Sequence, residues 1–313
     1  MRLRTFEAAS LSEAQAMVRA SLGDEALILS TERLDAGLRI TAAIEPEDDL
    51  GALLRTPERG PDPRLAALLS FHGVPRGVRA ALAGDAAGAE LEAALTRALA
   101  PRLQTAPDAG RRLFLGLPGH GKTLATARLA RRLVAAGTPP TVVAFEGPDD
   151  PPGDRLDGWL AASGLTVHKA ADLTALAEAA AVPGPLVVDA PGLSPASSRG
   201  AARLRAVVEA AGDVAVTLVL SCEGAPADLL ETAADFLTLG CRAVLPTKLD
   251  LSRRYGGLVG LACGGVGLLP ASVSDRPDDP PALLRPAGLA RLLVHRFETH
   301  AARPPELAEA RAS

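Results

Sequence analysis

The sequence has few of the residues that mark secreted or zinc-binding proteins. Its 313 residues include three cysteines, Cys222, Cys241 and Cys263, which are widely spaced and form no C-x-x-C pair. An odd number of scattered cysteines without a neighbouring His pair predicts neither a disulfide framework nor a zinc site. Cysteine usage therefore indicates a reducing compartment.

Strong net charge and long apolar runs are also absent. The 33 Lys and Arg residues against 37 Asp and Glu residues leave a net charge of −4. This balance offers no broad basic field, so we expect no nucleic-acid partner. The first residues lead into no apolar signal segment, and the uncharged stretch 256–273 is interrupted by six glycines and Pro270. We expect buried core there, in a cytoplasmic protein, with a membrane span as the alternative.

Patterning divides the chain into five segments. Residues 1–45 show a strand pattern, a helical pattern that Ser10 can cap and two more strand patterns, which predicts a small β-α-β-β domain. An acidic, proline-bearing linker follows at 46–63. Helical spacings at 64–109 predict a helical N domain of three or four short helices. Residues 301–313 are rich in Ala, Arg and Glu, and we expect a mobile tail.

The fifth segment, 110–300, alternates short apolar strands with helical patterns. This alternation predicts βαβ crossovers and an α/β domain whose mostly parallel sheet is covered by helices on both faces. The expected strands are Leu113–Leu117, Thr141–Phe145, Pro185–Asp189, Val214–Ser221, Ala243–Pro246 and Leu268–Val273.

A phosphate-binding motif opens this segment. Gly116–Thr123 matches G-x-x-x-x-G-K-[ST] between a strand pattern and a helical pattern, the context that a P-loop requires. Its glycines turn backbone N–H groups toward phosphate, Lys122 supplies positive charge, and the Thr123 hydroxyl can bind Mg²⁺. For His120 we expect the backbone N–H to matter, with a proton-carrying imidazole as the alternative. The predicted phosphate-binding residues are Gly116, Gly119, His120, Gly121, Lys122 and Thr123.

A second motif lies at the end of a later strand. Leu186–Asp189 is apolar until its last residue and opens the tetrad D-x-x-G. In a P-loop protein this position needs a carboxylate that faces Mg²⁺ and a glycine amide near the γ-phosphate. We therefore assign Asp189 to the metal and Gly192 to the γ-phosphate, although an Asp at a strand end can also be a simple turn residue.

A third motif selects the base. Thr247–Asp250 follows the strand Ala243–Pro246, and the Asp250 carboxylate can accept hydrogen bonds from the N1–H and 2-amino groups of guanine, which adenine lacks. The stem of Lys248 can lie along the purine plane. The predicted base-binding residues are Thr247, Lys248 and Asp250, with a solvated loop as the alternative.

These motifs, in this order at the ends of successive strands, resemble those of GTP-binding proteins, and the form T-K-L-D resembles the signal-recognition-particle (SRP) class. The segments 1–8, 13–14 and 22–31 resemble the amino-terminal domain of the FlhF family of flagellar-biosynthesis GTPases. The resemblance covers most of 1–45 and 110–300. It implies a P-loop NTPase domain, preceded by a helical N domain and a small amino-terminal domain, that binds GTP with Mg²⁺ and forms a nucleotide-dependent homodimer.

The resemblance also implies a cellular role in placing or assembling flagella. The implied partners are a MinD-like ATPase that stimulates hydrolysis, flagellar basal-body components and the inner membrane. We therefore expect a cytoplasmic protein that contacts the cytoplasmic side of the inner membrane peripherally, at the cell pole. The candidate membrane contact is a helical face with Arg76, Arg79, Arg97 and Arg102; a solvated surface is the alternative.

The loop after Thr141–Phe145 departs from the family, which has D-T-Y-R or D-T-F-R there. An ungapped count places Glu146 at the Asp position and Asp149 at the Arg position. An anion in place of a cation adds repulsion near the triphosphate, so we expect hydrolysis to be weak or to depend on a partner. A different register is the alternative, with Arg155 or Arg199 as the cation. The candidate catalytic residues are Lys122, Asp189 and Glu146.

Two further sites differ from the family. Leu124 and Ala125 stand where threonines follow the P-loop, and the last base-contacting loop, Ser272–Arg276, lacks the expected glycine. A GTP-dependent scaffold that does not hydrolyse GTP is therefore the alternative function. A third hypothesis, an ATP-dependent enzyme acting on a small molecule, is disfavoured by Thr247–Asp250.

Overall fold

The computed structural model describes residues 2–8, 10–22, 27–34, 37–44, 62–84, 90–107, 109–146 and 155–301. The chain forms two compact units, Met1–Arg59 and Gly60–Ser313. Most of the linker expected at 46–63, and the tail beyond residue 301, lie outside the described residues. None of the described helices is long and apolar enough to cross a membrane.

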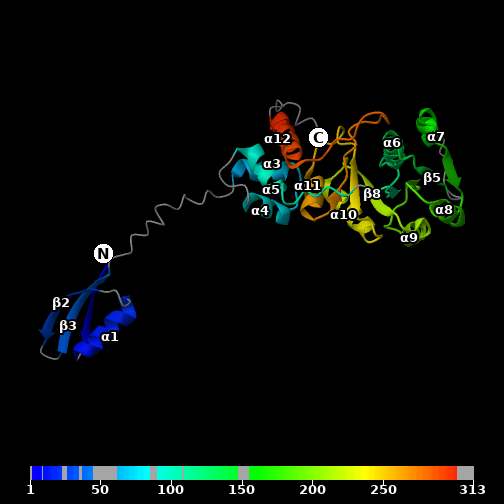
Figure 1. Cartoon of the computed structure of the whole chain (residues 1–313). Coiled ribbons are helices and arrows are strands. Elements are labelled where there is room, and N and C mark those ends of the chain that lie inside the picture. Colours follow the sequence, from blue (N-terminus) through cyan, green and yellow to red (C-terminus); the bar gives the residue numbers. More distant parts are fainter. Residues whose placement is uncertain are drawn as a thin grey trace. The chain divides into compact units, whose positions relative to one another are not determined.

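The first unit is a three-stranded antiparallel sheet with a helix packed on it (Figure 1). Its described elements are β1 (Arg2–Ala8), α1 (Leu11–Leu22), β2 (Leu27–Leu34) and β3 (Gly37–Ile44). Strand β3 lies between β1 and β2, and Ala14 and Val18 of α1 are buried with Ile40 of β3. Ser10 Oγ accepts a hydrogen bond of 3.3 Å from the Glu13 N–H and so caps α1. The expected β-α-β-β order is confirmed.

The second unit is built on a seven-stranded sheet in the order β10-β9-β8-β4-β7-β5-β6, in which every described pairing is parallel. The strands are β4 (Arg111–Leu115), β5 (Thr141–Phe145), β6 (Val167–Ala170), β7 (Leu186–Asp189), β8 (Ala215–Ser221), β9 (Ala243–Thr247) and β10 (Gly267–Leu268). Strand β4 lies between β7 and β8, so the chain crosses β4 as it passes from one to the other. In open α/β sheets such a switch point leaves a crevice for ligands at the carboxyl ends of the strands.

Helices cover both faces of this sheet (Figure 1). They are α6 (Lys122–Ala135), α7 (Arg155–Leu160), α8 (Leu173–Ala180), α9 (Ser198–Ala211), α10 (Pro226–Leu237) and α11 (Gly256–Cys263). Along β4, Leu113 and Leu115 belong to the main core with α8 to α11, whereas Phe114 packs with Ala125 and Leu129 of α6. Both faces of β4 are therefore buried, which explains its nearly continuous apolar sequence. The expected parallel α/β architecture is confirmed.

Two strand expectations need correction. The strand expected at Leu268–Val273 is reduced to β10, because Pro270 has no N–H to donate to a neighbouring strand. The sequence does not predict strand β6, because its two central residues, His168 and Lys169, are polar and both exposed. The uncharged stretch 256–273 contains the almost entirely buried helix α11 followed by β10, as expected for core.

The remaining described helices form a bundle. They are α3 (Pro63–Phe71), α4 (Arg76–Gly84), α5 (Leu91–Leu99) and the carboxyl-terminal α12 (Pro286–Ala301), which packs mainly on α5 and also on α3 (Figure 1). Asp62 caps α3 by accepting a 2.8 Å hydrogen bond from the Arg64 N–H, and Pro63 occupies the first turn. The sequence predicts the first three helices but not the return of the chain end to this bundle. The boundaries of the domains within 64–300 stay a prediction.

His72 joins the bundle to the segment that precedes α11. Its Nε2 lies 2.9 Å from the Leu293 carbonyl of α12, and its Nδ1 accepts a 3.3 Å hydrogen bond from the Tyr255 N–H. The tautomer that satisfies both partners carries its proton on Nε2. Burial lowers the pKa of His72 to about 4, the Leu293 carbonyl opposes this shift, and Arg254 adds to it. The imidazole is therefore neutral at physiological pH.

The depressed pKa of His72 predicts a loss of stability in acid. A histidine that must stay neutral stabilises the fold above its unfolded pKa of about 6.5, and this contribution is lost as the pH falls toward 4. The variant His72→Gln stays neutral and can still donate to the Leu293 carbonyl. Its free energy of unfolding relative to the wild type, measured with urea, should therefore be higher at pH 4.5 than at pH 7.5, by on the order of 2–3 kcal/mol. A difference between the two proteins that is the same at both pH values would contradict this account.

Candidate functional site

The three sequence motifs meet at the carboxyl ends of adjacent strands. The P-loop follows β4, the D-x-x-G tetrad begins at the end of β7, and T-K-L-D begins at the end of β9. Because β7, β4, β8 and β9 are consecutive in the sheet, these loops share one edge. The connection after β8, which no motif marked, lies between the P-loop and T-K-L-D.

Close backbone approach explains two glycines of this site. A Cβ on Gly116 would lie 2.4 Å from the Val219 carbonyl oxygen of β8, and its φ of 153° lies outside the range of other residues. A Cβ on Gly192 would lie 2.6 Å from Cα of Pro118 in the P-loop. The D-x-x-G segment therefore lies directly against the P-loop, as a γ-phosphate contact requires. The P-loop glycines Gly119 and Gly121 also have positive φ.

Lys122 lies at the start of α6 and is almost fully buried. Its ammonium donates a 3.0 Å hydrogen bond to the Leu117 carbonyl, across the curve of the P-loop. Burial lowers the pKa of Lys122, and the carboxylate of Asp189 opposes this shift. The ammonium thus stands inside the loop that the phosphates would occupy, with one carboxylate near enough to act on its charge.

Asp189 ends β7 beside this ammonium. The residue as a whole is partly exposed, but its Oδ1 atom is buried and has no hydrogen-bond partner among the described residues. Burial raises the pKa of Asp189 to about 6, hydrogen bonding from Thr123 and the charge of Lys122 oppose the shift, and the charge of Glu146 adds to it. A buried carboxylate oxygen without a partner is costly, so this site calls for a cation or a donor that the chain does not supply.

These residues fit a Mg²⁺ ion held together with a phosphate chain. The described residues contain no cluster of three His, Cys, Asp or Glu side chains that could hold a metal ion. The Thr123 hydroxyl and the Asp189 carboxylate supply two oxygen donors, and Mg²⁺ in phosphate sites takes its other ligands from phosphate and water. The predicted metal residues thus form a site that needs a phosphate to be complete.

Glu146 lies near this cluster. It directly follows β5, its N–H donates a 3.0 Å hydrogen bond to the Ala170 carbonyl, and its charge acts on the carboxyl group of Asp189. The ungapped count thus places an acidic residue beside the expected metal site. Asp149 lies outside the described residues. The guanidinium of Arg155 lies 5.9 Å from the centre of the Trp159 ring, on its own helix.

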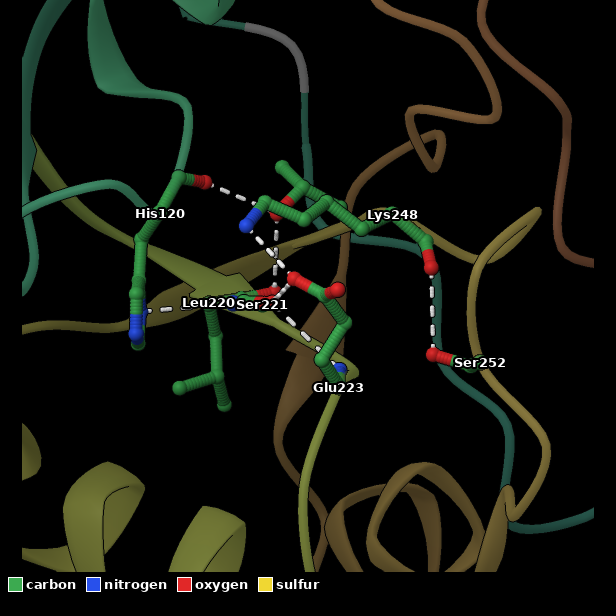
Figure 2. Close-up of polar contacts among 7 residues, drawn as sticks. His120, Leu220, Ser221, Glu223, Lys248 and Ser252 are labelled. Atoms are coloured by element: carbon green, nitrogen blue, oxygen red, sulfur yellow. Dashed lines mark hydrogen bonds and ion pairs between the residues drawn. The ribbon is translucent and has the colours of Figure 1, made fainter.

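Thr247, predicted to bind the base, contacts the P-loop. Its hydroxyl lies 2.8 Å from the His120 carbonyl oxygen and 3.3 Å from that of Leu220 (Figure 2). The hydroxyl therefore connects the end of β9 to the loop after β4. His120 Nδ1 in turn accepts a 3.3 Å hydrogen bond from the Ser221 N–H. Burial and the charge of Lys122 lower the pKa of His120, so its imidazole is a neutral structural acceptor.

Lys248 has a strained backbone and a partner that the sequence did not indicate. Among the described residues it alone has positive φ without being glycine, at 57°, a conformation that costs on the order of 1 kcal/mol and often occurs at functional sites. Its ammonium lies 2.5 Å from Glu223 Oε2 (Figure 2). The Ser221 hydroxyl also lies 3.2 Å from this carboxylate oxygen, so the Lys248 stem is held at its far end.

Asp250 is exposed and lies beside the last loop of the sheet edge. The N–H of the adjacent Leu249 donates a 3.3 Å hydrogen bond to the Ser272 carbonyl, and the Ser272 N–H donates to the Pro246 carbonyl at 2.8 Å. The expected base-contacting residues thus form one surface with Ser272–Arg276. The side chain that holds this loop, Arg128 of α6, was not indicated by any sequence motif.

Comparisons with known proteins agree with this geometry. No protein-family model and no curated protein matches the sequence significantly. Solved structures match: FlhF in complex with GTP and Mg²⁺ has a TM-score of 0.61 at 15% identity, covering 74% of this chain and 98% of that one. FtsY of Thermotoga maritima, a cell division protein, has a TM-score of 0.59 at 18% identity, covering 74% and 87%. Chloroplast FtsY of Physcomitrella patens has a TM-score of 0.57 at 20% identity, covering 75% and 87%.

The chain shares its fold with the solved FlhF and FtsY structures. At these identities the likeness establishes the fold, and it confirms the expected P-loop α/β class. Within this fold, the sequence motifs did not indicate Glu223 and Arg128. Their contacts depend on strand order and helix packing. Glu223 follows β8, the strand next to β4, and Arg128 bonds Ser272, which lies 144 residues later in the chain. Only knowledge of which strands are neighbours could have indicated them.

The burial of Asp189 predicts that its charge destabilises the protein without nucleotide. Because its folded pKa of about 6 is raised, the stability that this carboxyl contributes is present below its unfolded pKa and is lost as the pH rises through 6. Thermal unfolding without nucleotide should show Asp189→Asn to be more stable than wild type at pH 8, by on the order of 2 kcal/mol. The difference should shrink toward pH 4.5; a difference that grows in acid would refute the assignment.

Proposed function

We propose that this chain is a GTP-binding protein of the SRP GTPase type, whose GTP and Mg²⁺ occupy the edge formed by the loops after β4, β7 and β9. One observation carries the proposal: the buried Asp189 oxygen without a partner lies in a cluster with Lys122 and Thr123. The T-K-L-D loop belongs to the same site, because Thr247 bonds the P-loop. Phosphate and base recognition are therefore joined.

Each residue contributes a separate part of nucleotide binding. The P-loop N–H groups and Lys122 attract the phosphates, while Asp189 and Thr123 would hold Mg²⁺, which neutralises phosphate charge when bound. Gly192, against Pro118, would place its amide near the γ-phosphate. The ion pair with Glu223 keeps the Lys248 stem extended beside the base, and Asp250 accepts from guanine.

Hydrolysis is proposed to be weak or partner-dependent. Burial raises the pKa of Asp189 and the charge of Glu146 adds to this shift, so a second carboxylate lies close to where negative charge must be stabilised. Among the described residues, Lys122 is the cation whose charge acts on Asp189. The alternative, a GTP-dependent scaffold without turnover, is favoured by the same observation.

The cellular role is proposed to be that of an FlhF-like protein in flagellar placement or assembly. Support comes from the likeness to FlhF over 74% of this chain and from the amino-terminal segments that resemble that family. The proposal includes a nucleotide-dependent homodimer, a MinD-like regulator, basal-body components and peripheral contact with the inner membrane. Co-sedimentation with liposomes and sizing with GTP test its membrane and dimer parts.

Base selection gives the sharpest test of the proposal. Asp250→Asn replaces an acceptor by an amide that can donate to the 2-oxygen of xanthine, so its preference should change from GTP to xanthosine triphosphate by about tenfold or more. Titration calorimetry with GTP, ATP and xanthosine triphosphate measures this. Wild type should prefer GTP, and Lys122→Ala should lose all three nucleotides. Equal binding of GTP and ATP by the wild type would refute the proposed base.

The loop after β5 predicts which charge limits hydrolysis. Asp149→Arg should restore the cation expected in this family and raise the rate of phosphate release from GTP by about tenfold or more. The matched control Asp150→Arg adds the same charge one residue away and should have little effect. If Asp150→Arg accelerates release instead, the register of the loop is different from the ungapped count.

A further inference from the structure

Arg128 lies on α6, a turn and a half after Lys122, and reaches the loop that the resemblance assigns to the base. Its Nη1 bonds the Ser272 hydroxyl. Its Nη2 lies 3.2 Å from the Ser274 carbonyl, 2.8 Å from the Ser274 hydroxyl and 2.6 Å from the Arg276 carbonyl. One guanidinium thus bonds three residues of a five-residue loop.

Backbone bonds hold the start of this loop: the Leu249 N–H donates to the Ser272 carbonyl, and the Ser272 N–H donates to the Pro246 carbonyl. Its ends are joined where Ala271 and Ala282 exchange two backbone hydrogen bonds of 2.8 Å. A cavity of about 660 Å³ is lined by Leu129 of α6, Leu245 of β9 and Pro277, which directly follows Ser272–Arg276, among other residues. Val273 is 37% exposed. The bonds from Arg128 therefore add side-chain support from α6 to the backbone bonds of the loop.

Charge around Arg128 favours the same arrangement. Burial lowers the pKa of Arg128, and the carboxylates of Asp279, Asp250 and Asp275 oppose this shift. Asp250 is the residue proposed to bind guanine, so the guanidinium acts on both the base loop and the base-selecting carboxylate. The neighbouring Arg131 of α6 forms an ion pair with the more exposed Asp278, which lies outside Ser272–Arg276.

We propose that Arg128 is a positioning residue for guanine selection, because it holds Ser272–Arg276, which bonds the backbone next to Asp250, in register with the phosphate-binding helix α6. Lys122 and Arg128 belong to one helix, so the P-loop and the base loop keep a fixed separation. The planar fork of arginine suits this role, since two nitrogens can bond separate residues of a turn. A lysine carries its donors on a single atom.

The proposal rests on the proposed function and makes a selective prediction. Arg128→Met should weaken GTP binding by about tenfold or more, because the lost bonds include several to one charged group. ATP, whose base makes no bond to Asp250, should lose less than about threefold. The ratio of the two dissociation constants should therefore fall, a change that general loss of folding would not produce.

Calorimetry on the full chain measures this ratio for wild type, Arg128→Met, Arg128→Lys and the matched control Arg131→Met. We expect Arg128→Lys to be intermediate and Arg131→Met to resemble the wild type. Ser274→Ala, which removes one acceptor and leaves Arg128 in place, gives a milder test if Arg128→Met does not fold; it should lower the ratio in the same direction.

The possible outcomes separate the two proposals. A wild type that does not prefer GTP overturns the proposed function itself. A wild type that prefers GTP, with Arg128→Met and Ser274→Ala retaining that preference, overturns the role of Arg128 alone. An equal loss of GTP and ATP affinity in Arg128→Met also overturns it, because the residue would then support α6 or the P-loop in general.

Discussion

The burial of β4 between β7 and β8 is the constraint on which the rest of the structure depends. With neighbours on both sides and helices on both faces, this strand can hold its apolar side chains in only one register. A shift of one residue would turn Phe114 and Leu115 to the wrong faces. The P-loop therefore begins at a fixed point, and the close contact of Gly116 with Val219 depends on that point.

Polar contacts then join the loops that follow the strands. Thr247 connects the end of β9 to the P-loop, Glu223 holds the ammonium of Lys248, and Arg128 holds the loop after β10. Each bond crosses between elements distant in sequence. Together they join the loops proposed to bind phosphate and base, although the separate bonds, several of them near solvent, are individually modest in energy.

Asp189 shows how such a site can hold unfavourable groups. Its carboxyl group is buried with an oxygen that lacks a partner, next to a buried ammonium and near a second acidic side chain. A packed protein interior does not gather such charges for stability. The surrounding β-sheet holds them in place, and a phosphate chain with its metal ion would satisfy them.

The sequence by itself determined the parallel α/β class, the P-loop and the positions of Asp189 and T-K-L-D, because these depend on local patterns: apolar runs, glycine spacing and the residue at a strand end. It also indicated the amino-terminal β-α-β-β unit and three helices of the bundle. It did not indicate β6, the shortened β10, the return of α12 to α5, or the roles of Glu223 and Arg128. Those features depend on strand order and on contacts between residues far apart in the chain, which only the tertiary structure decides, because local preference carries no information about which elements become neighbours.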